Sequence, residues 1–370
     1  MIDIIIPAFK AHKTIWRAVA SIACQTAIKD IRVTIVNDCC PDGDYGQVVQ
    51  AFEPCMDIRE IKLPKNSGPG VARQTGIDST DGEFIAFLDA DDSFMTVRAL
   101  ETLRDAIQED DAYQCASGAF YNDKFVAAGA DRICRMMVWV FGKLYRRAFL
   151  DKYRIRFSNA RANEDSGFNH IVGMLCDGKE EKIKFVEEYL YLYHDDNPNS
   201  ITRINNAQYF YDQCNCGGID NMIYAIEHVR KYAPFSEQAI KATVDMLLQS
   251  YWYYAEVDQF MPSLTIPLWE HIKKFYHRCY KLIEGLVTDE AFRCYFSNAT
   301  RTVMRSGTFI GVVPKMTLAD FMERLRTEPY DPNLINEIRE EMKNDPDYHD
   351  MQLYNLACGV CPEDENAVQI

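Results

Sequence analysis

A short apolar run that ends in acidic residues constrains this chain more than any other stretch. Residues 84–88, Phe-Ile-Ala-Phe-Leu, have the length and composition of a buried β-strand, and Asp89, Asp91 and Asp92 follow directly. Ligands of open α/β sheets bind at the carboxyl ends of the strands, and clustered carboxylates repel one another unless a cation or strong donors neutralise them. Hard oxygen ligands suit Mg²⁺ or Mn²⁺. The alternative is an acidic loop in which Asp92 or Ser93 caps the next helix.

Strand and helix patterns alternate around this run. Apolar β-runs at residues 2–6 and 31–36 enclose a stretch, residues 12–25, whose apolar side chains recur at the spacing of one helix face. A strand, a helix and a second strand in that order imply a parallel pair with a right-handed crossover. The alternation repeats and predicts a doubly wound α/β fold, with strands at 58–63 and 84–88 and helices at 70–79 and 97–108.

Polar residues also follow the second strand and open a later helix. Asn37 and Asp38 leave the strand at 31–36 for a turn, at the sheet edge where Asp89 is expected. They could make local Asx-turn hydrogen bonds, or the Asp38 carboxylate could accept hydrogen bonds from a nucleobase edge or a ribose hydroxyl. The glycine-rich segment 66–76 then opens a helix, where exposed amides and the nearby guanidinium of Arg73 favour anions.

Together these motifs resemble the nucleotide-sugar-binding half of a family 2 glycosyltransferase with the GT-A fold. In chain order they are Ile-Ile-Ile-Pro-Ala-Phe at 4–9, Val-Asn-Asp at 36–38, Asn-x-Gly-x-x-x-Ala-Arg-x-x-Gly at 66–76 and Phe-Leu-Asp-Ala-Asp-Asp at 87–92. Residues 37–40 depart from the pattern, because Asn-Asp-Cys-Cys replaces the commoner Asp-Asp-Gly-Ser. That departure leaves the contacts of Asn37 and Cys39 open.

The resemblance implies a role for each matched residue. It implies a UDP-sugar donor whose nucleobase is surrounded by Pro7, Ala8 and Asp38. Asp91, in the DXD motif, would ligate Mn²⁺ or Mg²⁺ bound to the diphosphate, and Asp89 would be shared between ribose and metal. The donor-binding set implied on this half of the chain is Pro7, Ala8, Phe9, Asp38, Asn66, Gly68, Arg73, Asp89 and Ala90.

The acceptor half of such an enzyme has to supply a base. Residues 141–150 and 155–157, followed by Glu164 and Asp165, are similar to the family's acceptor-side pattern ending in Glu-Asp. The resemblance makes Asp165 the expected general base of an inverting transfer, in which a carboxylate deprotonates the acceptor hydroxyl as it attacks the anomeric carbon. On their own, these two residues are typical of an acidic helix start stabilised by the helix macrodipole.

A third group of candidates follows a later strand. An alternating strand pattern at 189–194 ends in His194, and the turn formers of 195–203 come next. Because a His or Arg near the end of that strand can reach the metal or the diphosphate in this family, His194 is a candidate third metal ligand and Arg203 a candidate phosphate contact. A histidine at a strand end can also be purely structural.

A basic stretch precedes the expected base. Residues 143–161 hold seven basic side chains against one acid. A solvated helix face is the default interpretation. The sharper hypothesis is a phosphate-bearing acceptor, with Lys143, Arg146, Arg147 and Glu164 on the acceptor side. The acceptor itself is left open among a glycan, a lipid phosphate, a polymer and a hydroxymethylated base in phage DNA.

Helical patterns dominate the rest of the chain, at 209–232, 236–255, 268–285, 289–297, 317–326 and 334–344. We expect a GT-A domain at 1–205, with a nucleotide-sugar half at 1–110 and an acceptor half at 111–205, then a helical domain at 206–315 and an acidic helical segment at 316–370. Thirteen acidic against four basic residues at 317–370 supply most of the net charge of −15, which mildly disfavours nucleic acid. The helical region could support a homo-oligomer, and its aromatic cluster at 251–254 is expected in a core or interface.

Chain length and cysteine content limit the number of domains and the cellular compartment that we expect. With 370 residues, 48% of them hydrophobic, the chain can form two domains with real cores. Its thirteen cysteines, without a secretory signal at the start, are expected as reduced thiols of a cytoplasmic protein. The apolar runs fall short of the ~18 residues of a membrane span.

Two other function classes stay open. One is nucleotidyl transfer on a related fold. The sequence has no glycine-rich, lysine-containing loop near Pro7, which argues against this reaction. The other is a non-catalytic scaffold that binds a sugar nucleotide. Evidence against it is the presence of three carboxylates suited to catalysis, Asp89, Asp91 and Asp165.

Overall fold

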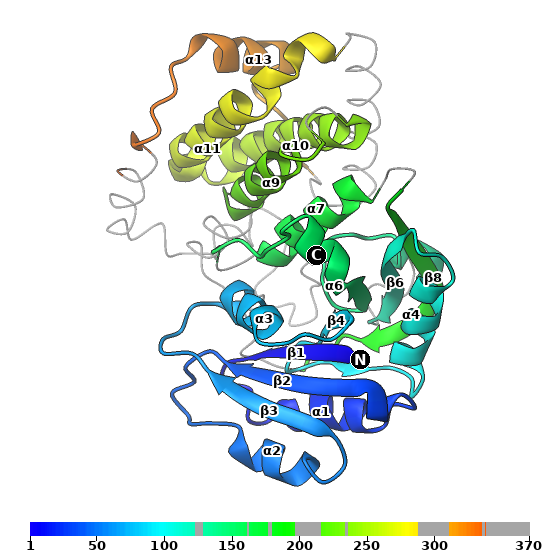
Figure 1. Ribbon diagram of the computed structural model, residues 1–370. Coiled ribbons are helices and arrows are strands. Elements are labelled where there is room, and N and C mark those ends of the chain that lie inside the picture. Colours follow the sequence, from blue (N-terminus) through cyan, green and yellow to red (C-terminus); the bar gives the residue numbers. More distant parts are fainter. Residues whose placement is uncertain are drawn as a thin grey trace. The chain divides into compact units, whose positions relative to one another are not determined.

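The chain forms two compact units, Met1–Arg203 and Ile204–Ile370, in a computed structural model (Figure 1). The structure describes residues 1–122, 129–160, 163–176, 180–196, 216–233, 236–287, 311–334 and residue 337. The predicted domain boundaries at 205 and 315 stay predictions. Within the described parts, no helix has the length and apolar character needed to cross a membrane.

The first unit is built on one mixed sheet of eight strands, in the order β3-β2-β1-β4-β7-β6-β8-β5. Helices cover both faces, with α3 on one face of β1 and β2 and with α1 and α2 on the other (Figure 1). The predicted α/β class is therefore confirmed. The strands are β1 Ile2–Ala8, β2 Ile31–Asn37, β3 Asp57–Lys62, β4 Phe84–Phe87, β5 Ser93–Phe94, β6 Tyr113–Tyr121, β7 Lys143–Arg146 and β8 Lys182–Leu192. The helices are α1 Ile15–Ala23, α2 Gly46–Phe52, α3 Pro69–Asp78, α4 Ala99–Gln108, α5 Ala130–Ile133, α6 Arg147–Lys152 and α7 Glu164–Leu175.

Strand direction decides which side chains share an edge of this sheet. β1 runs parallel to β2 and to β4, with Ala8 opposite Asn37 and Ile5 opposite Phe87, so the carboxyl ends of these strands meet at one edge. β7 runs antiparallel to β4, with Phe84 opposite Arg146, so β7 begins at that edge and ends at the other. We call the edge at the carboxyl ends of β1, β2 and β4 the site edge.

Apolar strands and helix faces form the core of this unit. The side chains of β1 from Ile2 to Ile6 are completely buried, as expected of a strand covered on both faces. Helix α1 buries Ile15, Val19 and Ile22, the residues that predicted its inner face. It begins at Ile15, later than the predicted residue 12, because residues 12–14 form a turn.

The described part of the second unit is helical, as predicted. Its helices are α9 Cys216–Val229, α10 Glu237–Phe260, α11 Thr265–Arg278 and α13 Leu318–Thr327. Tyr251, Trp252 and Tyr254 are buried, and the Tyr251 ring lies 5.3 Å from Phe321 of α13, so the aromatic cluster is core. The predicted helix at 289–297 lies outside the described residues, as does most of the one at 334–344.

Candidate active site

The acidic run follows β4 at the site edge, as predicted. The backbone N–H of Leu88 still donates to Ile5 of β1, at 3.2 Å, and Asp89 then leaves the sheet. A tight turn comes next, in which the N–H of Asp92 donates to the carbonyl of Asp89 at 3.1 Å. This turn presents Asp89, whose side chain is 26% exposed, and the partly exposed Asp91 at the edge, while Asp92 is buried.

Arg73 joins the two halves of the predicted site. From α3, one guanidinium nitrogen lies 2.6 Å from the Asp89 carboxylate and the other lies 2.5 Å from the Glu164 carboxylate. The Arg73 side chain is only 6% exposed. Burial acts to lower the pKa of Arg73, but the carboxylates of Asp89, Glu164 and Asp165 outweigh burial and hold that pKa above its ordinary value. The strand-end carboxylate and the Glu-Asp pair are therefore held together by one cation.

The Glu-Asp pair begins α7. Asn163, with a left-handed φ of 56°, precedes the helix, and the Ser166 N–H donates to the Asp165 carboxylate at 2.7 Å. Burial, with the neighbouring Glu164 carboxylate, raises the pKa of Asp165 to about 7, although Arg73 and the Ser166 N–H oppose the rise. Burial also raises the pKa of Glu164. Asp165 thus has the pKa of a general base that works near neutral pH.

Close packing explains the glycine at position 70. A Cβ there would lie 2.6 Å from Cγ of Glu164 and 3.1 Å from the carbonyl oxygen of Ser158. Only a residue without a side chain lets α3 approach α7 this closely, and the approach brings Arg73 to Glu164.

Gly70→Ala is therefore expected to destabilise the protein by ~1–3 kcal/mol, the usual cost of overpacking. Gly173→Ala, within α7, is the matched control, because no atom beyond the adjoining helix backbone lies within 4 Å of the added Cβ. We expect that control to be neutral or stabilising by up to ~1 kcal/mol. Urea unfolding of both variants measures the difference, and equal stabilities would contradict the close approach.

Asp38 lies at the site edge and anchors the glycine-rich loop. Its two carboxylate oxygens accept from the backbone N–H groups of Ser67, at 2.7 Å, and Gly68, at 2.8 Å. The Asn66 side chain donates to the Asp38 carbonyl, and the Asp38 N–H donates to Ala8. Gly68 has a φ of 89°, which favours glycine, and α3 begins at the next residue. These bonds hold the predicted nucleotide-binding loops together.

Asp92 has a role that the sequence did not reveal. Helix α4 begins at Ala99 after the N-cap Arg98, so neither Asp92 nor Ser93 caps it, and that alternative is wrong. The buried Asp92 carboxylate accepts from the Tyr191 hydroxyl and from the His194 N–H, both at 2.8 Å. Burial, with the charges of Asp89 and Asp91, raises the pKa of Asp92 well above its usual range.

His194 follows the end of β8 and faces the acidic turn. Its Nε2 lies 3.0 Å from the hydroxyl oxygen of Ser93. Burial and the charge of Arg17 lower the pKa of His194, so the imidazole is neutral at pH 7, the form that binds metals. Arg203, the candidate phosphate contact, lies outside the described residues.

Arg17 of α1 is a further residue at this site that sequence reasoning missed. Its guanidinium donates to the backbone carbonyl of Asp91 and forms an ion pair with Asp196, at 2.7 Å. Asp196 stands two residues after His194, so Arg17 ties the acidic turn to the segment that follows β8. An arginine on an amphipathic helix carries no sequence signal for such a contact.

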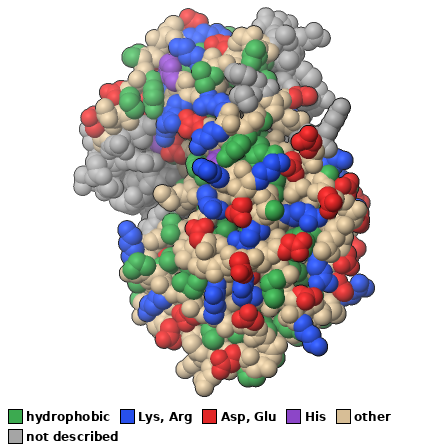
Figure 2. Space-filling model, in the orientation of Figure 1, with side chains coloured by type: hydrophobic (Ala, Val, Ile, Leu, Met, Phe, Trp, Pro, Cys, Tyr) green, Lys and Arg blue, Asp and Glu red, His purple; other side chains and the backbone are tan. Residues whose placement is uncertain are grey.

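The predicted basic acceptor surface is wrong for Arg146 and Arg147. Because β7 is antiparallel to β4, both residues lie at the edge opposite the site. The Arg146 guanidinium donates to the carbonyls of Tyr113 and Ile107, and the Arg147 guanidinium to groups that include the Asp3 carboxylate. The solvated-face interpretation fails for these two residues too, because their guanidinium groups make structural bonds, whereas Lys152 and Arg154 of the same stretch are exposed. Figure 2 shows acidic and basic side chains interspersed over the face that it draws.

Lys143, at the start of β7, is on the site edge but buried in the sheet. Burial lowers its pKa to about 8, although nearby groups that include Asp165 act to raise it. It is therefore the one member of the predicted basic set Lys143, Arg146 and Arg147 that lies beside the expected base.

The family described as Glycosyl transferase family 2 matches residues 3–167. The uncharacterized glycosyltransferase EpsJ of Bacillus subtilis is 27% identical over 225 residues, which cover 55% of this chain and 63% of EpsJ. The poly(ribitol-phosphate) beta-N-acetylglucosaminyltransferase TarP of Staphylococcus aureus is 26% identical over 230 residues, which cover 56% of this chain and 68% of TarP. The aligned region spans less than two thirds of EpsJ, and 30% of the glycosyltransferase GlyA of Streptococcus pneumoniae.

Solved structures support the fold. Residues 1–349 of S. aureus TarS in complex with UDP-GlcNAc align with a TM-score of 0.62 and 19% identity, over 82% of this chain and 90% of that one. Residues 3–167 therefore form a domain that is similar to the family 2 glycosyltransferases.

Proposed function

We propose that this protein transfers a sugar from a UDP-sugar to an acceptor hydroxyl, with inversion, using a divalent cation and Asp165 as general base. The observation that carries the proposal is the bridge from Asp89 through Arg73 to Glu164, with both ion-pair distances at 2.6 Å or less. The bridge links Asp89, one of the expected donor carboxylates, to Glu164, the chain neighbour of the expected base Asp165. An inverting transfer needs both groups at one reaction centre.

Uridine diphosphate as the leaving group is supported by the TarS complex with UDP-GlcNAc, which shares this fold. The donor-binding set that we propose keeps the residues of the family motifs, which are Pro7, Ala8, Phe9, Asp38, Asn66, Gly68, Arg73, Asp89 and Ala90. Phe9 is 43% exposed beside the Asp38 loop, so its ring is accessible to a nucleobase. Because Asp38 already accepts two backbone N–H groups, we propose that it acts on the nucleobase chiefly by shaping the loop.

The acidic turn suits a divalent cation. Asp89 and Asp91 lie close enough to the buried Asp92 for their negative charges to raise its pKa, so negative charge is concentrated at this turn. Carboxylate oxygens are ligands that suit Mn²⁺ or Mg²⁺. Asp91, Asp89 and His194 would hold the cation. When bound, it would stabilise the negative charge that develops on the leaving diphosphate.

The protein's own groups supply the proton transfer. Asp165 accepts the proton of the acceptor hydroxyl as the oxygen attacks the anomeric carbon and the bond to the diphosphate breaks. The Ser166 N–H orients one carboxylate oxygen of Asp165. Arg73 holds Glu164 in place beside the base, and its charge opposes the rise that burial causes in the pKa of Glu164. Proximity of these groups converts the transfer into a reaction within one bound complex.

The pH profile of kcat/KM is expected to rise through about pH 7. Asp165 must be deprotonated to act as base, and its pKa is raised to about 7, so activity is lost as the pH falls below that value. Initial rates of UDP release between pH 5 and pH 9 measure this profile. A flat profile down to pH 5 would contradict a base with a raised pKa, because an unshifted carboxylate would still be ionised there.

Nucleotide binding tests the metal site. UDP is expected to raise the melting temperature of the parent protein only when Mn²⁺ or Mg²⁺ is present. Asp91→Asn is expected to lose this metal-dependent rise, whereas Asp105→Asn, a 61%-exposed carboxylate on α4, is expected to keep it. Equal stabilisation by UDP with and without metal would count against the proposed ligands.

Activity tests the whole proposal. A panel of UDP-sugars that starts with UDP-GlcNAc is incubated with Mn²⁺ and an acceptor panel, and released UDP is measured. The acceptors are a glycan, a lipid phosphate, poly(ribitol phosphate) and hydroxymethylated DNA, with the polymer placed first because the names of TarP and TarS state it as their substrate. Release of pyrophosphate from a nucleoside triphosphate and a sugar phosphate would instead indicate nucleotidyl transfer. Binding of UDP-sugar without turnover on any acceptor would favour a scaffold.

A further inference from the structure

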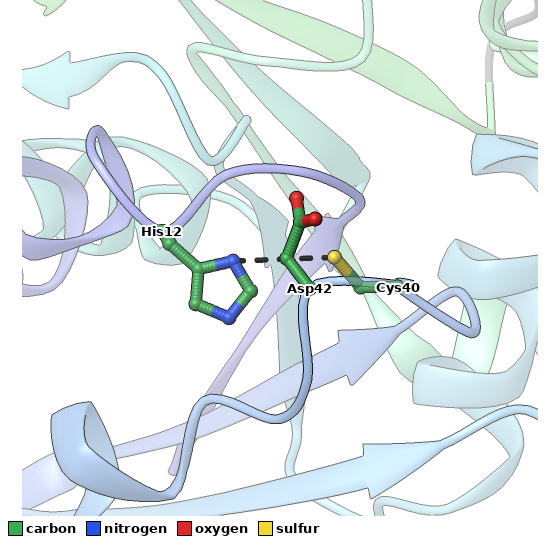
Figure 3. A group of neighbouring side chains, drawn as sticks. All are labelled: His12, Cys40 and Asp42. Atoms are coloured by element: carbon green, nitrogen blue, oxygen red, sulfur yellow. Dashed lines mark hydrogen bonds between the residues drawn. The ribbon is translucent and has the colours of Figure 1, made fainter.

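A second group of metal-binding side chains lies at the site edge, in the loops after β1 and β2. His12 follows β1, and Cys40 and Asp42 follow β2 (Figure 3). One ligand atom from each of the three side chains lies within 4.8 Å of the others. None of the three belongs to the cation ligands proposed above, Asp89, Asp91 and His194.

The contacts of the His12 ring direct its Nδ1 nitrogen toward the Cys40 sulfur. Its Nε2 lies 3.0 Å from the carbonyl oxygen of Asp44, and because a carbonyl only accepts, Nε2 carries the proton. In a neutral imidazole Nδ1 then has a lone pair, and Nδ1 lies 3.9 Å from the Cys40 sulfur. Metal-binding histidines commonly donate their other N–H to a backbone carbonyl in this way.

Neighbouring groups hold these ligands in position. The His12 ring stacks on Tyr45, with centroids 4.5 Å apart. Tyr45 is fully buried, and its hydroxyl accepts from the N–H of Ala11 at 3.2 Å. The buried Cys40 sulfur accepts from the N–H of Lys10 at 3.3 Å, which fixes its position. Asp42 is exposed, so its carboxylate can rotate toward the other two.

From these contacts we propose that His12 Nδ1, Cys40 Sγ and the Asp42 carboxylate form a zinc site with an open fourth position. Tetrahedral zinc with ordinary Zn–S and Zn–N bonds separates sulfur from nitrogen by about 3.6 Å, close to the observed distance. A set with thiolate, imidazole and carboxylate suits Zn²⁺ and does not suit Mg²⁺. The ion would join the loops that carry Phe9 and Asp38, and thereby stiffen the nucleobase side of the proposed donor site.

Cobalt substitution of the 370-residue protein under reducing conditions tests this site. We expect Co²⁺ to give a thiolate-to-cobalt charge-transfer band, and one equivalent of Zn²⁺ to abolish it. Cys40→Ser and His12→Gln are expected to lose the band. Cys39→Ser is the matched control and is expected to keep it, because the Cys39 sulfur contacts the carbonyl of Pro64 instead.

Zinc affinity gives a second measurement. Asp42→Asn is expected to weaken Zn²⁺ binding by at least ~10-fold, since even loss of an outer-shell partner costs that much. Asp91→Asn is expected to keep the cobalt band, so failure of the catalytic proposal and failure of the zinc proposal are distinguishable. Absence of a band in the parent protein, or a band that persists in Cys40→Ser or His12→Gln, would overturn the zinc site and leave a thiol–imidazole hydrogen bond.

Discussion

Asp165→Asn is expected to lower the rate of sugar transfer by ~10²- to 10⁴-fold in a protein that remains folded, because that is the usual contribution of a positioned general base. Asparagine keeps an oxygen that can accept from the Ser166 N–H, so the start of α7 is preserved. The rate of UDP release at saturating donor and Mn²⁺ measures the effect. Asp105→Asn, at an exposed position on α4, is the control and should have parental activity.

The same substitution should stabilise the protein above neutral pH. Since the pKa of Asp165 is raised in the folded state, that state keeps a proton that the unfolded chain loses between about pH 4 and pH 7. Stability therefore falls as the pH rises through this range, and the cost is fully present at pH 8. Asp165→Asn removes the cost, so its melting temperature should exceed that of the parent at pH 8 but match it near pH 4. Parental activity in Asp165→Asn, or a lower melting temperature at pH 8, would contradict this account.

Arg73→Met is expected to destabilise the protein by ~3–5 kcal/mol, the usual cost of removing one partner of a buried ion pair. The substitution leaves Glu164, whose side chain is 4% exposed, without its cation and places it near Asp89 and Asp165. Arg156→Met is the matched control, because that side chain is 41% exposed and lies 3.8 Å from Asp78. An exposed pair of this kind contributes only ~0–1 kcal/mol.

A double substitution separates the charge effect from the packing effect. Glu164→Gln in the Arg73→Met background removes the uncompensated buried carboxylate, so it should recover part of the lost stability. Chemical denaturation of the two single variants and the double variant supplies the cycle. A loss below ~1 kcal/mol in Arg73→Met, or no recovery in the double variant, would show that the bridge between Asp89 and Glu164 is not a structural element.

Local sequence patterns predicted the first half of the sheet well. β1, β2 and β4 are short apolar runs with polar residues directly after them, and a parallel arrangement brings those residues to one edge. That rule alone predicts that Asp38 and Asp89 share an edge of the sheet. The family motifs added Glu164 and Asp165, whose nearness to Asp89 depends on the long-range contact through Arg73.

Contacts between distant residues limited what the sequence could predict about the site. Asp92 pairs with Tyr191 and His194, about a hundred residues later, and a strand-end aspartate looks the same with or without such partners. Arg146 and Arg147 were misplaced because the antiparallel direction of β7 has no local signal, and reversing a strand moves its last residues to the opposite edge. The approach of His12 to Cys40 likewise depends on two loops that meet only in the fold.

The most direct test of the central claim is a crystal structure of the protein with UDP and Mn²⁺. The account predicts the ion on Asp91, with the diphosphate beside Asp89 and the nucleobase beside Phe9 and the Asp38 loop. It also predicts that the Asp165 carboxylate faces the space next to the β-phosphate, where a donor sugar would lie. Nucleotide bound away from the site edge, or bound there with Asp165 turned into the core, would contradict it.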